Sequence, residues 1–116
     1  MWYISLKRQV ASIQCRVMMV NTYLEKIRDI VLKHMENEQV DVYLFGSWAR
    51  GSMRRSSDVD IAVDGKKTDI SLKISALREA LEESTVPYRV DVVDMGRASE
   101  VLCEEIRREG ILWKKA

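Results

Sequence analysis

Proline is nearly absent from this sequence, with one residue in 116, and glycine occurs five times. Disordered segments are enriched in these residues and poor in apolar ones, so the composition argues against a disordered chain. The two cysteines, Cys15 and Cys103, lie far apart and form no metal-ligand pair, and we expect reduced thiols in a cytoplasmic protein. No apolar run approaches the ~20 residues that span a bilayer, so we expect no membrane segment.

A surplus of positive charge is also missing. Lys7, Arg8 and Arg16 are three of the 19 basic residues, and the first 18 residues carry no acid. Residues 19–116 therefore hold 16 basic and 18 acidic side chains, a net of −2. Nucleic-acid binders meet phosphates with an excess of Lys and Arg. We therefore expect no direct nucleic-acid binding by this part of the chain.

The first 18 residues differ from the rest. They end at the pair Met18-Met19, which suggests the hypothesis that translation starts at one of these two and that residues 1–18 are a misassigned extension. The rival interpretation is a short helix or strand that covers the core or a partner. Residues 19–116 are enough for one domain with a single modest core. We therefore expect an N-terminal extension, 1–18, and one domain, 19–116.

Apolar periodicity predicts helices and strands that alternate along this domain. Thr22-x-x-Glu25 has the pattern of a capping box and predicts a helix from this point to about Asn37. Gly110 predicts the end of the last helix. Further on, we expect strands at 40–45, 58–63 and 88–93 and a helical turn at 48–51. A helix should begin near Thr68 or Asp69 and bury Ile70, Ile74, Leu77 and Leu81, and another should run from Ser99 to about Glu109. The apolar tail at 111–113 should add an edge strand or meet a partner.

This order of elements predicts a mixed α/β fold of the α+β type. We expect a small mixed sheet with the candidate site on one face and the helices packed on the other. The first two strands should be antiparallel neighbours, although residues 46–57 form a long connection between them.

Carboxylates mark two of the expected strands. Asp58 and Asp60 are two residues apart, so their side chains project to the same face, with Cα atoms roughly 6–7 Å apart. Two carboxylates in one site repel each other and usually need a cation between them. Mg²⁺ suits such oxygen ligands, since it takes one or two carboxylates plus substrate phosphates. Asp91 can join them if the strands lie side by side, whereas Asp94 points the opposite way and is interpreted as a solvated turn residue.

A second candidate element lies upstream, where the first strand meets a helical turn. Gly46 lets the backbone approach a bulky anion closely, and the N–H groups at a helix start can hold phosphate, with the Ser47 hydroxyl adding a hydrogen bond. Arg50, Arg54 and Arg55 lie in or after this turn and could neutralise a triphosphate.

The joint spacing resembles a known family. Gly46-Ser47, ten residues, and then Asp58-Val59-Asp60 is similar to the signature of the DNA polymerase beta-like nucleotidyltransferase superfamily. The short chain and the run GSWARGSMRRSSDVDIAV resemble its minimal nucleotidyltransferase (MNT) branch, and the resemblance covers about residues 20–110.

The resemblance implies a role for each residue of the motif. Gly46 and Ser47 would bind the triphosphate of ATP. Asp58 and Asp60 would coordinate two Mg²⁺ ions, and Asp91 would hold one of these ions and help to activate the acceptor hydroxyl. This assignment fits two-metal catalysis, in which one ion acts on the attacking oxygen and the other on the leaving group.

Two positions of the turn extend the comparison. Arg50 falls where the family often has arginine and would contact phosphate. Trp48 departs from the pattern, because arginine is common there; it would either stack on a nucleobase or pack.

The resemblance also implies a partner. Larger members of the superfamily carry a domain that grips the acceptor, and this sequence shows none. MNT proteins are commonly antitoxins that transfer AMP from ATP to a tyrosine of a HEPN-domain RNase toxin, so we expect such a protein adenylyltransferase in a hetero-oligomer. The alternative is a catalytically weak or inactive module that neutralises its toxin by binding, for which Trp2, Leu112 and Trp113 are candidate contacts. Transfer to a small molecule, as in aminoglycoside-modifying relatives, is a third interpretation.

Overall fold

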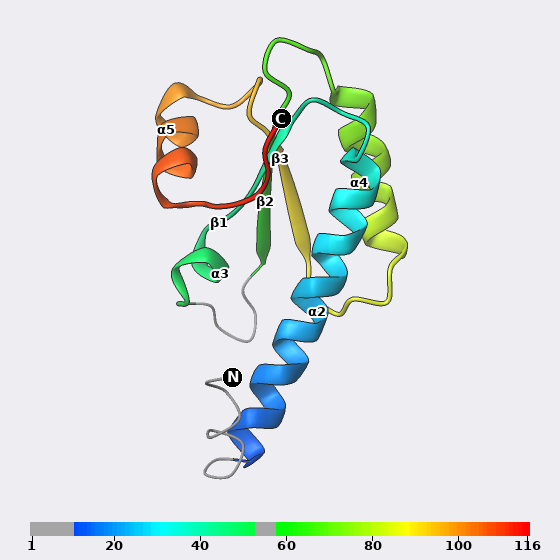
Figure 1. Cartoon of the computed structure of the whole chain (residues 1–116), viewed down its shortest axis with the longest axis vertical. Coiled ribbons are helices and arrows are strands. Elements are labelled where there is room, and N and C mark those ends of the chain that lie inside the picture. Colours follow the sequence, from blue (N-terminus) through cyan, green and yellow to red (C-terminus); the bar gives the residue numbers. More distant parts are fainter. Residues whose placement is uncertain (1–10, 53–57) are drawn as a thin grey trace.

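Helices and strands alternate along the chain, as the apolar periodicity predicts. They are seen in a computed structural model that describes residues 11–52 and 58–116, with side chains from Thr22 onward (Figure 1). None of the helices in these two ranges is long and apolar enough to cross a membrane. The helices are α2 (Ala11–Met35), α3 (Ser47–Arg50), α4 (Ser71–Glu83) and α5 (Glu100–Glu109), and the strands are β1 (Asp41–Phe45), β2 (Val59–Asp64), β3 (Val90–Asp94) and β4 (Ile111–Lys114).

The four strands form one mixed sheet in the order β3-β2-β1-β4. Strands β1 and β2 are antiparallel neighbours, as predicted, with Phe45 opposite Asp60. Strand β3 runs parallel to β2 and places Asp91 opposite Asp60. The apolar tail adds β4 as an edge strand antiparallel to β1. The mixed α/β fold class is therefore confirmed.

Helix α2 corrects one expectation. Thr22 lies inside this helix, which includes residues from Ala11 onward, so Thr22 and Glu25 do not form a capping box at a helix start. Residues 11–21 contain neither proline nor glycine, so no helix-breaking residue in the sequence stops the helix from extending upstream. The helix ends at Met35, slightly before the expected end.

The hypothesis about the translation start stays a prediction. Helix α2 runs across Met18 and Met19. The first ten residues lie outside the described part of the chain, as do residues 53–57 of the basic loop.

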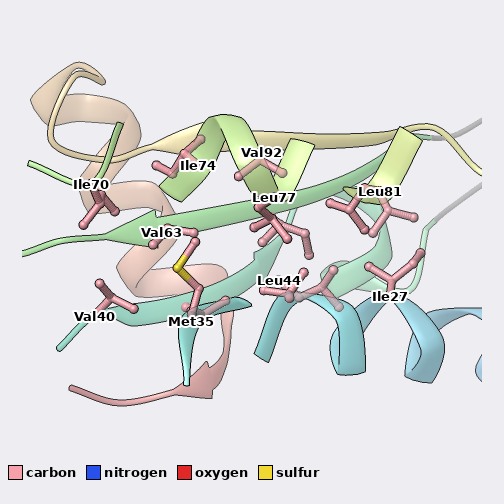
Figure 2. Packing of buried hydrophobic residues seen from close by; sticks show 14 of the residues in the cluster. Ile27, Met35, Val40, Leu44, Val63, Ile70, Ile74, Leu77, Leu81 and Val92 are labelled. Atoms are coloured by element: carbon pink, nitrogen blue, oxygen red, sulfur yellow. The ribbon is translucent and has the colours of Figure 1, made fainter. Parts of the chain in front are cut away.

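The main apolar core lies between the sheet and helices α2 and α4 (Figure 2). On α2 the buried face recurs at four-residue spacing, with Ile27, Val31 and Met35 fully buried. Val59 and Ile61 of β2 point into the same core, so Asp60 between them faces the other side of the sheet. The predicted stripe of α4 and its N-cap residue is also buried, and comprises Ile70, Ile74, Leu77 and Leu81.

Helix α5 corrects the expected placement of the helices. We expected helices on one face only, but α5 lies on the opposite face from α2 and α4, the face of Asp60 (Figure 1). It packs through Cys103 and Ile106 against Ala62 and Met95, all of them buried. Strand alternation explains this arrangement, because Ala62 points away from the main core and its small side chain leaves room for a helix. Helix α5 therefore shares a face of the sheet with the candidate site.

One buried charge makes the stability of the fold depend on pH. Asp41 is 5% exposed and accepts hydrogen bonds from Lys66 Nζ at 2.6 Å and from the Ala116 N–H at 2.7 Å. Burial acts to raise the pKa of Asp41, but these hydrogen bonds and the Lys66 charge outweigh it, and the pKa is lowered. Because the pKa of Asp41 is lower in the folded state, the carboxylate stabilises the fold when the pH lies above its unfolded-state pKa. This contribution is lost as the pH falls through the folded-state pKa.

We therefore expect Asp41→Asn to lower the free energy of unfolding at pH 7 by about 1–3 kcal/mol, because Lys66 loses its charged acceptor. The difference from wild type should shrink when the pH falls below the ordinary range of an aspartate. Urea unfolding at pH 7 and at about pH 3 checks this. Asp29→Asn, on an exposed position of α2, is the control and should change little at either pH. A deficit of Asp41→Asn that stays constant with pH would contradict the assignment.

Candidate active site

The turn after β1 has a backbone that only glycine adopts readily. Gly46 has φ 75° and ψ −153°, a region essentially restricted to glycine. Its carbonyl accepts the N–H groups of Ala49 and Arg50, both at 3.1 Å. These bonds close α3, the helical turn that the sequence predicts, and they place Ser47 at its first position.

Gly46 lies directly against Asp60. A Cβ atom built on Gly46 would lie under 3.0 Å from Oδ2 of Asp60, closer than real Cβ atoms approach other atoms. The pairing of Phe45 with Asp60 brings the two strands to this point. The missing side chain of Gly46 therefore allows the turn to reach the carboxylate on the neighbouring strand.

Three carboxylates act on one another at this place. Asp60 stands opposite Asp91 across β2 and β3, and Asp58 directly precedes β2, one residue before the strand that was expected to include it. Burial raises the pKa of Asp60, the charges of Asp91 and Asp58 raise it further, and Arg50 acts in the opposite direction. The structure therefore brings the three predicted carboxylates close enough to interact electrostatically.

This donor set fits a hard divalent cation shared with a substrate. Within residues 22–52 and 58–116, no three His, Cys, Asp or Glu side chains are grouped closely enough to hold a metal ion by themselves. Mg²⁺ usually takes only one or two protein carboxylates and completes its shell with water and substrate phosphates. The repulsion that Asp60 experiences from Asp58 and Asp91 is what such a cation would offset.

Arg50 acts electrostatically on Asp60 and also reaches α5. Its Nη1 atom is 3.9 Å from Oε2 of Glu109, and the two side chains are 51% and 42% exposed. A cavity of about 110 Å³ opens beside Arg50, between Gly46 and α5. An exposed ion pair contributes about 0–1 kcal/mol, so Arg50 can exchange Glu109 for a phosphate with little loss of stability.

Trp48 packs in the apolar core. Its side chain is 5% exposed and belongs to the main core. Its ring lies edge-on to Tyr88, with centroids 5.0 Å apart and planes at 75°. Of its two predicted roles, packing is therefore confirmed. Tyr88 could not be predicted as its partner, because the two residues lie far apart in the chain and no local spacing connects them.

Residues at the margin of the site complete the comparison with the sequence. Asp94 accepts a hydrogen bond from the Gly96 N–H at 3.0 Å and lies 3.7 Å from Nε of Arg97. It therefore caps the turn after β3, as predicted, but its side chain is only 13% exposed and is not the solvated group that was expected. Arg54 and Arg55 lie outside the described residues.

Comparison with known proteins places this arrangement in a family. The chain matches the polymerase beta nucleotidyltransferase family over residues 25–115. It is 39% identical over 69 residues to the protein adenylyltransferase MntA of Shewanella oneidensis, which covers 60% of this chain and 49% of that protein. The chain thus spans about half the length of this curated relative.

Two solved structures resemble it as well. One is a toxin–antitoxin complex with AMP-PNP, at 30% identity and a TM-score of 0.62, covering 77% of this chain and 73% of that chain. The other is a tri-AMPylated Shewanella oneidensis HEPN toxin in complex with an MNT antitoxin, at 26% identity and a TM-score of 0.57, covering 79% and 72%. Because the family match spans the turn at Gly46 and all three carboxylates, the chain belongs to the polymerase beta nucleotidyltransferase family.

Proposed function

We propose that this protein is a Mg²⁺-dependent protein adenylyltransferase that serves as a cytoplasmic antitoxin. It transfers AMP from ATP to a tyrosine hydroxyl of a HEPN RNase toxin, with which it assembles into a hetero-oligomer. The contact of Gly46 with Asp60 carries this proposal, because it joins the turn after β1 to the carboxylates of two neighbouring strands. The relatives support a HEPN toxin as the acceptor, since one is named a protein adenylyltransferase and another is bound to an AMPylated HEPN toxin.

Each part of the site has a role in this proposal. Gly46 and Ser47 bind the triphosphate, because backbone N–H groups at a helix start and a hydroxyl can donate hydrogen bonds to phosphate oxygens. Asp58 and Asp60 hold Mg²⁺. Asp91, on the outer strand of the sheet, would also hold Mg²⁺.

The reaction is a substitution at the α-phosphorus of ATP. The acceptor oxygen forms a bond to this phosphorus, the bond between the α- and β-phosphates breaks, and pyrophosphate leaves. Asp91, which is exposed, assists in removing the proton from the acceptor hydroxyl. Arg50 offsets negative charge on the phosphates. Bound Mg²⁺ supplies positive charge to the attacking and leaving oxygens.

Label transfer tests the proposal. The purified protein is incubated with Mg²⁺, ATP labelled at the α-phosphate, and a purified HEPN-domain protein. We expect label on the HEPN protein, mass spectrometry to locate AMP on a tyrosine, and EDTA to abolish the reaction. The double variant Asp58→Ala/Asp60→Ala should transfer no label. Absence of transfer by wild type, or equal transfer by the double variant, would reject the proposal.

A second candidate function is neutralisation by binding alone. Ile111 and Leu112 on the edge strand β4 are 46% and 47% exposed, which gives a protein partner apolar surface to cover. In that case the RNase activity of the toxin would be inhibited equally by wild type and by Asp58→Ala/Asp60→Ala, without any AMP on the toxin. Inhibition that requires both ATP and the carboxylates favours the adenylyltransferase.

A further inference from the structure

We propose that Trp48, seated against Tyr88, is a positioning residue that holds the Gly46–Ser47 turn against the strands of Asp60 and Asp91. This inference rests on the proposed function, because it assigns the residue that keeps the triphosphate-binding turn in place. Trp48 itself does not touch the substrate, since its side chain lies in the core.

Helix α3 needs such an anchor. It has only four residues, and a helix this short is not stable by itself because its nucleation is unfavourable. Both residues that flank it, Gly46 and Gly51, are glycines with positive φ, so the backbone on either side is intrinsically permissive. Trp48 is the buried residue of α3. The orientation of the turn therefore depends on what Trp48 packs against.

The contacts of Trp48 lead to the carboxylates. Its ring meets Tyr88 edge to face at 5.0 Å between centroids, and Tyr88 meets Tyr23 of α2 at 5.8 Å in the same geometry. Edge-to-face pairs at such distances are attractive beyond their buried area. The three rings thus connect α3, α2 and the segment that enters β3.

Tyr88 stands at the point where the two carboxylate strands begin to pair. The next residue, Arg89, accepts a hydrogen bond from the Val59 N–H at 2.9 Å, and Val59 directly follows Asp58. A shift of Tyr88 would therefore move the start of both strands, and a shift of Trp48 would move Ser47, its neighbour in the chain. The pair of Trp48 and Tyr88 therefore fixes the position of Ser47 relative to the start of the two strands.

The first test is spectroscopic. The variant Trp2→Phe/Trp113→Phe keeps Trp48 as the sole tryptophan, and Trp2→Phe/Trp48→Phe keeps Trp113 as a matched control. When Mg²⁺ and AMP-PNP are added, we expect the emission of Trp48 to change saturably and that of Trp113 to stay constant. Calorimetry on the same samples measures binding independently. Binding without any change in Trp48 emission would overturn the inference.

The second test is kinetic. Trp48→Ala is expected to lower kcat/KM for ATP by on the order of 100-fold, because displacements of about 1 Å in a reacting geometry have effects of this size. Trp48→Phe keeps an aromatic edge against Tyr88 and should restore most of the loss. Ile74→Ala, in the same core but on α4, is the control for stability and should leave the kcat/KM of the folded fraction unchanged.

The outcomes separate the two proposals. If wild type neither binds AMP-PNP nor transfers AMP, the proposed function fails and the inference fails with it. If wild type is active and Trp48→Ala loses activity only in proportion to its unfolded fraction, as Ile74→Ala does, only the positioning role is rejected. Assays at a temperature where circular dichroism shows each variant folded make the distinction.

Discussion

Asp60→Asn is expected to lower the rate of AMP transfer by about a thousand-fold, since several kcal/mol of transition-state stabilisation depend on the charge at this position. The carboxylate is central to the site: it contacts Gly46, stands opposite Asp91, and interacts electrostatically with Arg50. Asparagine keeps the shape of the side chain but removes the negative charge that would hold Mg²⁺.

The same change should not weaken the fold. Burial and the neighbouring carboxylates raise the pKa of Asp60, so its ionisation opposes folding once the pH exceeds the unfolded-state value. In EDTA at pH 7, Asp60→Asn is therefore expected to unfold at the same temperature as wild type or higher, and this difference should vanish under acid conditions. Such opposite effects on activity and stability are typical of functional sites.

Asp94→Asn is the matched control for this prediction. Asp94 lies on β3 but caps the turn after it, and an asparagine oxygen can still accept the hydrogen bond from Gly96. Label transfer and thermal unfolding should both stay near wild type. An Asp60→Asn variant that retains transfer, or that is inactive only because it is unfolded at the assay temperature, would contradict the assigned role of Asp60.

Gly46→Ala adds a single methyl group, and we expect it to damage the site more than the same addition at any other position of the site. The backbone at Gly46 lies in a region essentially restricted to glycine, which gives about 1–3 kcal/mol of strain for alanine. In addition, the new Cβ would overlap with the carboxylate of Asp60 and force it to move. We expect loss of folding stability together with at least a roughly 100-fold lower transfer rate, because the displaced groups are the proposed reacting centre.

Gly51→Ala separates the two causes. Gly51 also has a positive φ, 74°, but a Cβ there would meet nothing within 4 Å. Alanine at this left-handed position should therefore have a similar or smaller strain of about 1–2 kcal/mol, with the transfer rate close to wild type. Urea unfolding and label transfer on both variants check this. Equal activity loss in the two variants would show that backbone strain, and not the contact with Asp60, explains the effect.

Local patterns of the sequence predicted much of this protein. Strand alternation predicted that Asp58 and Asp60 lie close together and set Asp94 apart, although Asp58 lies one residue before β2. Helical spacing predicted the buried face of α4. The last helix was expected to begin at Ser99, and the Oγ of Ser99 caps α5 by accepting the Leu102 N–H at 3.2 Å. These features depend on residues near one another in the chain.

The tertiary structure decided what depends on distant residues. Thr22 has the local pattern of a helix cap, yet it lies within a helix, because the upstream residues continue the same conformation. The placement of α5 beside the site followed from the small side chain of Ala62, and the role of Trp48 followed from Tyr88. The sequence by itself predicted the residues that are proposed to carry the chemistry. Only the packing of distant segments decided how closely Gly46 meets Asp60, because such contacts leave no local period in the chain.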